Sequence, residues 1–186
     1  MRLLRKRSIA ILITVVVVIA ATLFGVYNTS GRYTREVEAL FYDGVYLKDQ
    51  GFIQPGINSH LENCANAALG LATLMEGYPE LAGYAESLLT ARRELMSAGS
   101  VSAKERATRE MTDGFTRLLE AAGNVDLTGR EKDAATQFDS TFNGALIAIS
   151  NSRYNDAVSA HINNQNAVLR LIGYLLSADQ PAFFFR

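Results

Sequence analysis

The chain has 186 residues, of which about half are apolar, which is enough for one ordinary domain and a membrane anchor. Four of its 18 basic residues precede a long apolar run, and the first acidic residue is Glu36. The part after that run therefore has 14 basic against 19 acidic residues, a net charge of about −5. It has no basic footprint for nucleic acid, and we expect no nucleic-acid partner.

The apolar run, residues 9–27, reads IAILITVVVVIAATLFGVY and contains no charge. Its length is just sufficient for a helix to span a bilayer. The basic residues before it predict a cytoplasmic N-terminus over residues 1–8 and an extracytoplasmic domain over residues 28–186. A cleaved signal peptide is the alternative, with Val18-Ile19-Ala20 as a weak cleavage site. We favour a retained single-pass anchor, because the apolar run continues past that site.

The rest of the chain is predicted to be helical. Residues 33–49 place Val37, Leu40, Phe41 and Val45 on one face, and GFIQPG at residues 51–56 is interpreted as a turn. A second helix is expected from about Ile57, with its inner face formed by Leu61, Cys64, Ala65, Ala68, Leu71 and Met75. Gly77 and Pro79 predict either a kink or a split, after which helix resumes until Gly99.

Two capping boxes predict the starts of the last helices, since a Ser or Thr caps an amide while a Glu three residues later reaches back. Ser102 and Glu105 open a helix that buries Met111, Phe115 and Leu118 and ends at Gly123. Thr128 and Glu131 open the last and longest one. Its predicted stripe consists of Phe138, Phe142, Leu146, Ile149, Val158, Ile162, Leu169, Ile172 and Leu176. The sequence thus predicts an all-α fold: an N-terminal transmembrane helix and an extended antiparallel four-helix bundle with coiled-coil-like spacing.

An amide-rich stretch, SRYNDAVSAHINNQN at residues 152–166, lies on this last helix. A helical wheel places Asn155, Gln165 and Asn166 beside the apolar stripe and Arg153 and Asp156 away from it. The stretch is interpreted either as a solvated edge or as a set of amides that fix helix register, with ligand binding as a third alternative. We expect Asn155 to pair with a neighbouring helix.

The sequence contains no recognisable catalytic motif, and we expect no catalytic residue and no cofactor. His60 and Cys64 lie four residues apart, which could give two metal ligands, whereas a zinc site needs three or four. A small buried cysteine beside a surface histidine is the favoured interpretation, and the metal alternative stays open. Cys64 is the only cysteine.

Two blocks of the sequence resemble the LemA family of bacterial membrane-anchored helical proteins. IAISNSRYNDAV, residues 147–158, resembles its Ala-Arg-x-x-Tyr-Asn-x-x-Val type of pattern, with Tyr154, Asn155 and Val158 at the pattern's spacing and Arg153 and Ala157 beside them. Pro181 and Phe183–Phe185 are similar to its Pro-x-x-Phe ending. Weaker matches occur at Gly77, Tyr78, Ala91 and Arg92, and at Tyr42, Val45 and Leu61.

The chain departs from the family pattern in several places. It has no Trp, it has Glu62-Asn63 where the family has a basic pair, and its segments around Ala145 and Ala167 differ. The resemblance is thus to a divergent member. It implies a membrane helix that carries an extended four-helix bundle, no established catalytic residues, and a role through protein contacts in the bacterial cell envelope.

Two functions follow as hypotheses. The first is a non-catalytic interaction or scaffold module in the bacterial inner membrane, with a protein partner or self-association. Tyr154, Asn155, Gln165, Asn166, Phe183, Phe184 and Phe185 are its structural or interaction candidates. The three adjacent Phe are expected to fold back onto the helices or to bind a partner or the bilayer. The second is an extracytoplasmic ligand sensor that works with a separate transducer.

Overall fold

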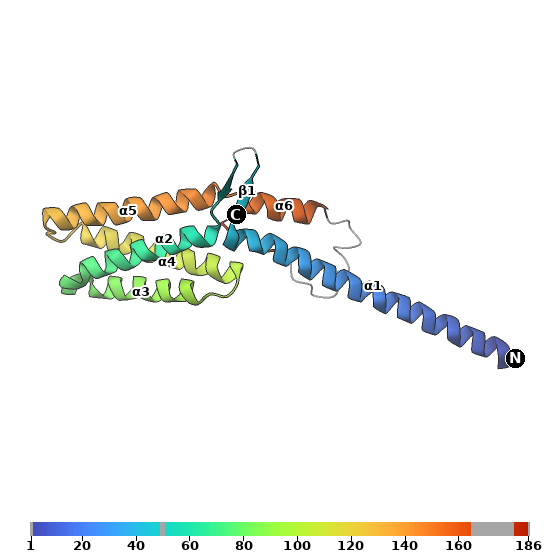
Figure 1. Cartoon of the computed structure of the whole chain (residues 1–186). Helices are drawn as coiled ribbons and strands as arrows, with labels where there is room; N and C mark the ends of the chain where they lie inside the picture. The colour runs from blue at the N-terminus through green and yellow to red at the C-terminus, as the bar shows by residue number, and fades with distance from the viewer. Residues whose placement is uncertain (1, 49–50, 165–180, 186) are drawn as a thin grey trace. The chain divides into compact units, whose positions relative to one another are not determined.

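The computed structural model describes residues 2–48, 51–164 and 181–185 and is mostly helical (Figure 1). The chain forms two compact units. One contains Met1–Val37 and Val158–Pro181, and the other contains Glu38–Ala157 and Ala182–Arg186. Predicted residues Gln165, Asn166, Leu169, Ile172 and Leu176 lie outside the described residues.

Helix α1, Arg2–Asp43, carries the apolar run. It is the one helix among the described residues that is long and apolar enough to cross a membrane, with a mean hydropathy of 2.9 over its most apolar stretch. None of that stretch is buried within the protein. Large apolar side chains such as Ile11, Val16 and Phe24 are exposed along it. Toward its C-terminal end, the ring of Tyr33 lies 6.3 Å from that of His161 in the same unit.

A two-stranded antiparallel hairpin follows α1, where the sequence predicts helix to residue 49 and then a turn. Strand β1, Val45–Leu47, pairs with β2, Phe52–Gln54, with Tyr46 opposite Ile53. Helix ends because Gly44 adopts the left-handed conformation, φ 89°, and its N–H donates to Leu40 O at 3.0 Å. The β-branched and aromatic residues that follow favour strand. The helical prediction was therefore wrong beyond Asp43.

Gly44 is a position that only glycine fits. A Cβ atom built there would overlap main-chain atoms of Gln54, Pro55 and Gly56, and the positive φ adds strain for any other residue. We expect Gly44→Ala to lower the free energy of unfolding by about 1–3 kcal/mol, measured by urea denaturation of the full chain in detergent. The matched control is Gly77→Ala, since a Cβ on Gly77 meets nothing within 4 Å. Equal stability of the two variants would contradict this expectation.

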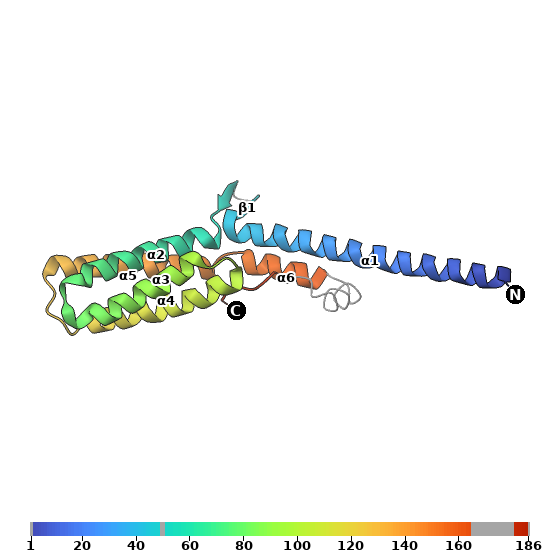
Figure 2. The ribbon, with the colours of Figure 1, turned by 90° about the horizontal axis from the view of Figure 1, so that it is seen from below.

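Besides the end of α1 and the hairpin, the larger unit contains four whole helices. They are α2, Ile57–Leu74, α3, Ala82–Ser97, α4, Val101–Ala122, and α5, Gly129–Ser150. Helix α2 packs against α3, α4 and α5, and α3 packs against α4 (Figure 2). The chain reverses direction at each connection between them (Figure 1). Between α2 and α3 the chain forms two short 3-10 turns, Met75–Gly77 and Pro79–Leu81, so Gly77 and Pro79 split the helix.

The predicted inner faces of α2 and α4 are confirmed. Their buried residues include Leu61, Cys64, Ala65, Ala68, Leu71 and Met75, and Met111, Phe115 and Leu118. The rings of Phe115 and Phe142 stack at 4.0 Å between α4 and α5. Aromatic stacking of two buried rings adds to the stabilisation that their burial gives.

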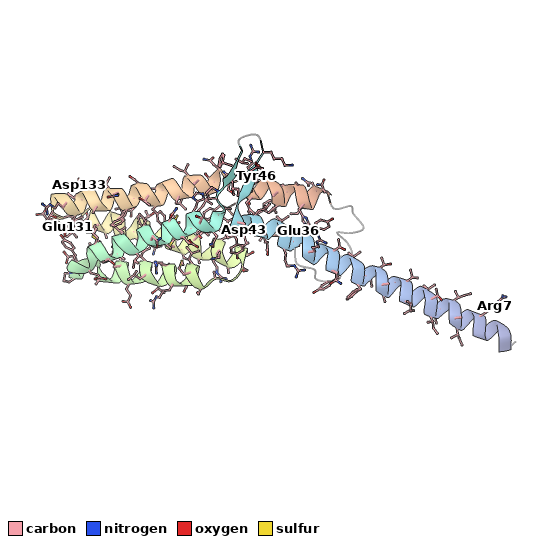
Figure 3. All side chains as sticks on the ribbon, in the orientation of Figure 1. Arg7, Glu36, Asp43, Tyr46, Glu131 and Asp133 are labelled. Carbon is pink, nitrogen blue, oxygen red and sulfur yellow. The ribbon has the colours of Figure 1, made fainter. Side chains whose placement is uncertain are left out.

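The capping predictions have different outcomes. The box at Thr128 and Glu131 is present, with Glu131 Oε2 accepting from the Thr128 amide at 2.8 Å. Tyr78 also donates to that carboxylate at 2.8 Å, which joins the α2–α3 connection to the start of α5, where Figure 3 labels Glu131. The box at Ser102 is wrong. Ser100 caps α4 instead and accepts from Ala103 N at 3.2 Å, because an earlier start buries Val101.

The last predicted helix is not continuous. Helix α5 ends at Ser150, and α6, Tyr154–Asn164, begins after a short break. Ser-Asn-Ser at residues 150–152 competes with the helix for hydrogen bonds. Ser150 Oγ donates to Ile147 O at 2.8 Å, and Ser152 Oγ accepts from Tyr154 N at 3.2 Å. The prediction of one helix across residues 128–176 was therefore wrong.

Candidate functional site

A binding site for the end of the chain lies where α1, α4 and α6 contribute side chains. We call Ala182–Phe185 the tail, and Phe41, Arg109, Tyr154 and Asn155 the tail site. All of these residues belong to the larger unit. The contacts between the tail and the tail site join residues that are at least 28 positions apart in the sequence.

Asn155 binds the main chain of the tail through both ends of its side-chain amide. Its Nδ2 donates to Phe184 O at 2.7 Å, and its Oδ1 accepts from Phe184 N at 2.9 Å. One side chain thus satisfies the donor and the acceptor of a single buried residue. The expectation that Asn155 pairs with a neighbouring helix is wrong, because its partner is the non-helical tail. The wheel that placed it assumed a helix across the break at residues 151–153.

Tyr154 holds the preceding part of the tail. Its hydroxyl donates to Ala182 O at 2.9 Å, and the side chain is fully buried. Burial raises the pKa of the Tyr154 phenol, and the nearby Glu38 carboxylate adds to the effect. The hydroxyl therefore remains a hydrogen-bond donor throughout the physiological pH range.

An aromatic cluster receives the side chain of Phe184, which is only 1% exposed. Its ring centroid lies 5.3 Å from that of Phe41. Phe41 in turn contacts Tyr154 edge-on at 5.5 Å and Tyr42 at 5.2 Å. These are the distances at which aromatic pairs stabilise one another. The two tyrosines fix the Phe41 ring against which Phe184 packs.

Arg109 on α4 contacts the last described residue of the tail. Its guanidinium carbon lies 5.2 Å from the Phe185 ring centroid, in cation–π range. The Arg109 side chain also binds Glu105 at 2.7 Å, one helical turn earlier. Phe185 has a positive φ of 52°, which is uncommon for a bulky residue. Phe183 is half-buried.

Of the seven predicted candidates, the structure brings Tyr154, Asn155, Phe184 and Phe185 together. Phe183 lies within the same tail, and Gln165 and Asn166 are outside the described residues. Sequence reasoning missed Phe41 and Arg109 as site residues. Phe41 was placed on an inner helix face, which identified it as buried, but nothing in the sequence connects Arg109 with the tail.

Among the described residues, His60 and Cys64 have no third metal-ligand candidate grouped with them. In the described part of the chain, no group of three or more His, Cys, Asp or Glu side chains could hold a metal ion. Cys64 is buried and donates to Phe142 O at 3.7 Å. Its burial raises the pKa of the thiol from 9.0 to about 12.

The Cys64 pKa has a measurable consequence. At pH 8 only about one thiol in ten thousand is ionised in the folded chain, so iodoacetamide should label Cys64 negligibly until the chain is unfolded. Because the pKa of the Cys64 thiol is higher in the folded than in the unfolded chain, ionisation of the thiol opposes folding. The contribution of this group to the free energy of unfolding is fully present below pH 9 and is lost as the pH rises toward 12. Mass spectrometry of labelled protein checks this. Rapid labelling of the native chain would contradict it.

A shallow depression between α3 and α4 is acidic. It is lined by Glu86, Glu94, Glu110, Asp113 and Arg117, among others. A hydrogen bond between Glu94 and Glu110, together with partial desolvation, raises the pKa of the Glu110 carboxyl. The tail site differs from this depression in that its side chains make specific hydrogen bonds and ring contacts with a distant segment of the chain.

Comparisons with family models, with curated proteins and with solved structures give no match to this chain.

Proposed function

We propose that this chain is a single-pass, membrane-anchored helical protein that acts as a non-catalytic interaction or scaffold module in the bacterial cell envelope. The observation that carries the proposal is the exposed apolar surface of α1. Side chains such as Ile11, Val16 and Phe24 are exposed there, and water would solvate them poorly. A bilayer would cover them, and the run of residues 9–27 has the required length.

The finer architecture is also part of this proposal. We infer that α2, α3, α4 and α5 form an extended antiparallel four-helix bundle over residues 28–186, outside the cytoplasm. The packing of α2 against the three other helices supports this. The four basic residues among positions 1–7 support the orientation. The resemblance of residues 147–158 and 181–185 to the LemA family supports the same arrangement.

Two features support a role in protein contacts. The tail site holds main chain and an aromatic ring, which is the chemistry of peptide binding. The hairpin presents apolar side chains to solvent. Tyr46, which Figure 3 labels, is 59% exposed. Its cross-strand partner Ile53 is 61% exposed. Exposed apolar groups of this kind are typical of interaction surfaces.

Photo-crosslinking in native membranes tests the proposal. A crosslinking amino acid at Tyr46 should capture one or more defined proteins, identified by mass spectrometry, and the chain should stay in the membrane after alkaline carbonate extraction. The matched control position is Tyr84, an exposed tyrosine on α3. Release of the chain by carbonate, or identical captures at both positions, would contradict the proposal.

A further inference from the structure

The tail is bound as a peptide ligand would be, by two kinds of contact. The hydrogen bonds of Asn155 and Tyr154 involve only main-chain atoms, the N–H and C=O of Phe184 and the C=O of Ala182. Main-chain bonds of this kind give affinity without selecting a side chain, as when an extended peptide adds to a sheet edge. The selection comes from the pocket that buries the Phe184 ring.

The aromatic wall of the tail site is also held by contacts that do not involve the tail. Phe41 is held by Tyr42 and Tyr154, both from the larger unit's own helices. Tyr154 is fixed at the start of α6 by the hydrogen bond of its amide to Ser152 Oγ. Arg109 is oriented by its ion pair with Glu105 on the same helix. A ligand would therefore meet a largely pre-formed site.

The connection between the tail and the site is long. Sixteen residues, 165–180, separate Asn164 at the end of α6 from Pro181. Their covalent reach is at most roughly 55 Å. None of the hydrogen bonds or ring contacts of the tail requires that it come from the same chain. Exchange of an identical segment between copies preserves every contact, which makes it a low-cost route to a dimer.

We propose that the tail site is a peptide-binding site for an extended segment with a buried phenylalanine, and that a second copy of this chain supplies that segment by reciprocal exchange of tails. This deepens the proposed function and rests on it. A tethered tail has an effective concentration on the order of millimolar, so exchange requires copies that are confined together. Anchoring in one bilayer provides that confinement.

A complementation experiment tests the exchange. One copy carries Asn155→Ala and keeps its tail, and a second, differently tagged copy keeps its site but lacks residues 182–186. Both are reconstituted as full chains in the same liposomes. Neither copy can pair with itself through this contact, whereas the mixture can. We expect the two copies to co-purify at least about tenfold more than a mixture whose tail donor also carries Phe184→Ala. Equal recovery from both mixtures would overturn the proposal.

A second measurement separates the site from the source of its ligand. The synthetic peptide Pro-Ala-Phe-Phe-Phe-Arg, residues 181–186, should bind the tail-less copy saturably and displace the donor copy. The same peptide with Phe184→Ala should bind at least about tenfold more weakly. Peptide binding without co-purification would overturn exchange between copies. Absence of both would overturn the site itself, while captures at Tyr46 in native membranes would still stand.

Folding of the donor copy is checked by circular dichroism, because Asn155→Ala removes two hydrogen bonds. Asn155→Asp is the second donor variant, since its carboxylate keeps an acceptor for Phe184 N–H, loses the donor to Phe184 O and places a negative charge against that oxygen. With a folded donor of either kind, failure to co-purify with the tail-less copy overturns the proposal.

Discussion

Replacing Phe41 with alanine should lower the free energy of unfolding by about 3–5 kcal/mol. The ring is fully buried and contacts three other rings, those of Tyr42, Tyr154 and Phe184. Its removal leaves a cavity in the tail site, and the Phe184 ring loses its packing partner. Urea denaturation of the full chain in detergent, followed by circular dichroism, gives the change.

The control for Phe41→Ala is Tyr84→Ala, which removes an exposed ring from α3 and should change stability by less than about 0.5 kcal/mol. A second consequence is specific to the tail site. Carboxypeptidase should remove the last residues of the Phe41→Ala chain faster than those of the unaltered chain. Similar digestion rates, or a stability loss no larger than that of Tyr84→Ala, would show that Phe41 does not hold the tail.

Asn155→Ala should lower the free energy of unfolding by about 2–4 kcal/mol. The substitution leaves the N–H and the C=O of Phe184 without their partner, and each buried unsatisfied group costs about 1–3 kcal/mol. The loss is smaller than that for Phe41 because water can reach part of the vacated space beside half-buried Asn155. The same denaturation experiment measures it.

The matched control is Asn143→Ala on α5. That amide donates to Asp139 at 2.7 Å within one exposed turn, so its loss should cost less than about 0.5 kcal/mol. If the two asparagine variants unfold alike, the amide of Asn155 contributes no more than a surface residue does, and the stretch at residues 152–166 returns to the interpretation of a solvated edge.

The parts of the fold that the sequence predicts well are those set by periodicity. The apolar spacing of residues 57–75 and 111–118 identifies side chains that are buried, because a helix that packs along its length repeats its contacts every three to four residues. The capping box at Thr128 is equally local, since three residues determine its hydrogen bonds.

Predictions fail where local preferences compete. Val45–Leu47 continues the apolar pattern of α1, yet the helix ends at Gly44. These residues form a strand that pairs with Phe52–Gln54 instead. At residues 150–152, the apolar stripe continues across a break that the Ser and Asn side chains stabilise. A helical wheel assumes one continuous helix, and the break at residues 151–153 therefore made the predicted partner of Asn155 wrong.

The tail shows what sequence alone leaves open. Three adjacent Phe predict burial somewhere, and folding back, a partner and the bilayer all satisfy that requirement. In the structure, Phe184 is buried where Phe41 and Asn155, 114 positions apart in the sequence, meet at one place. Contacts this distant depend on the packing of the whole unit.

Asn155 acts by holding the tail, and a double-mutant cycle tests this role most directly. Stability is measured for the full chain, for Asn155→Ala, for the chain lacking residues 182–186, and for the combination. The tail contacts predict that Asn155→Ala costs about 2–4 kcal/mol in the full chain and less than about 0.5 kcal/mol once the tail is absent. Equal losses in both backgrounds would show that Asn155 stabilises the helices independently of the tail, and would contradict the claim.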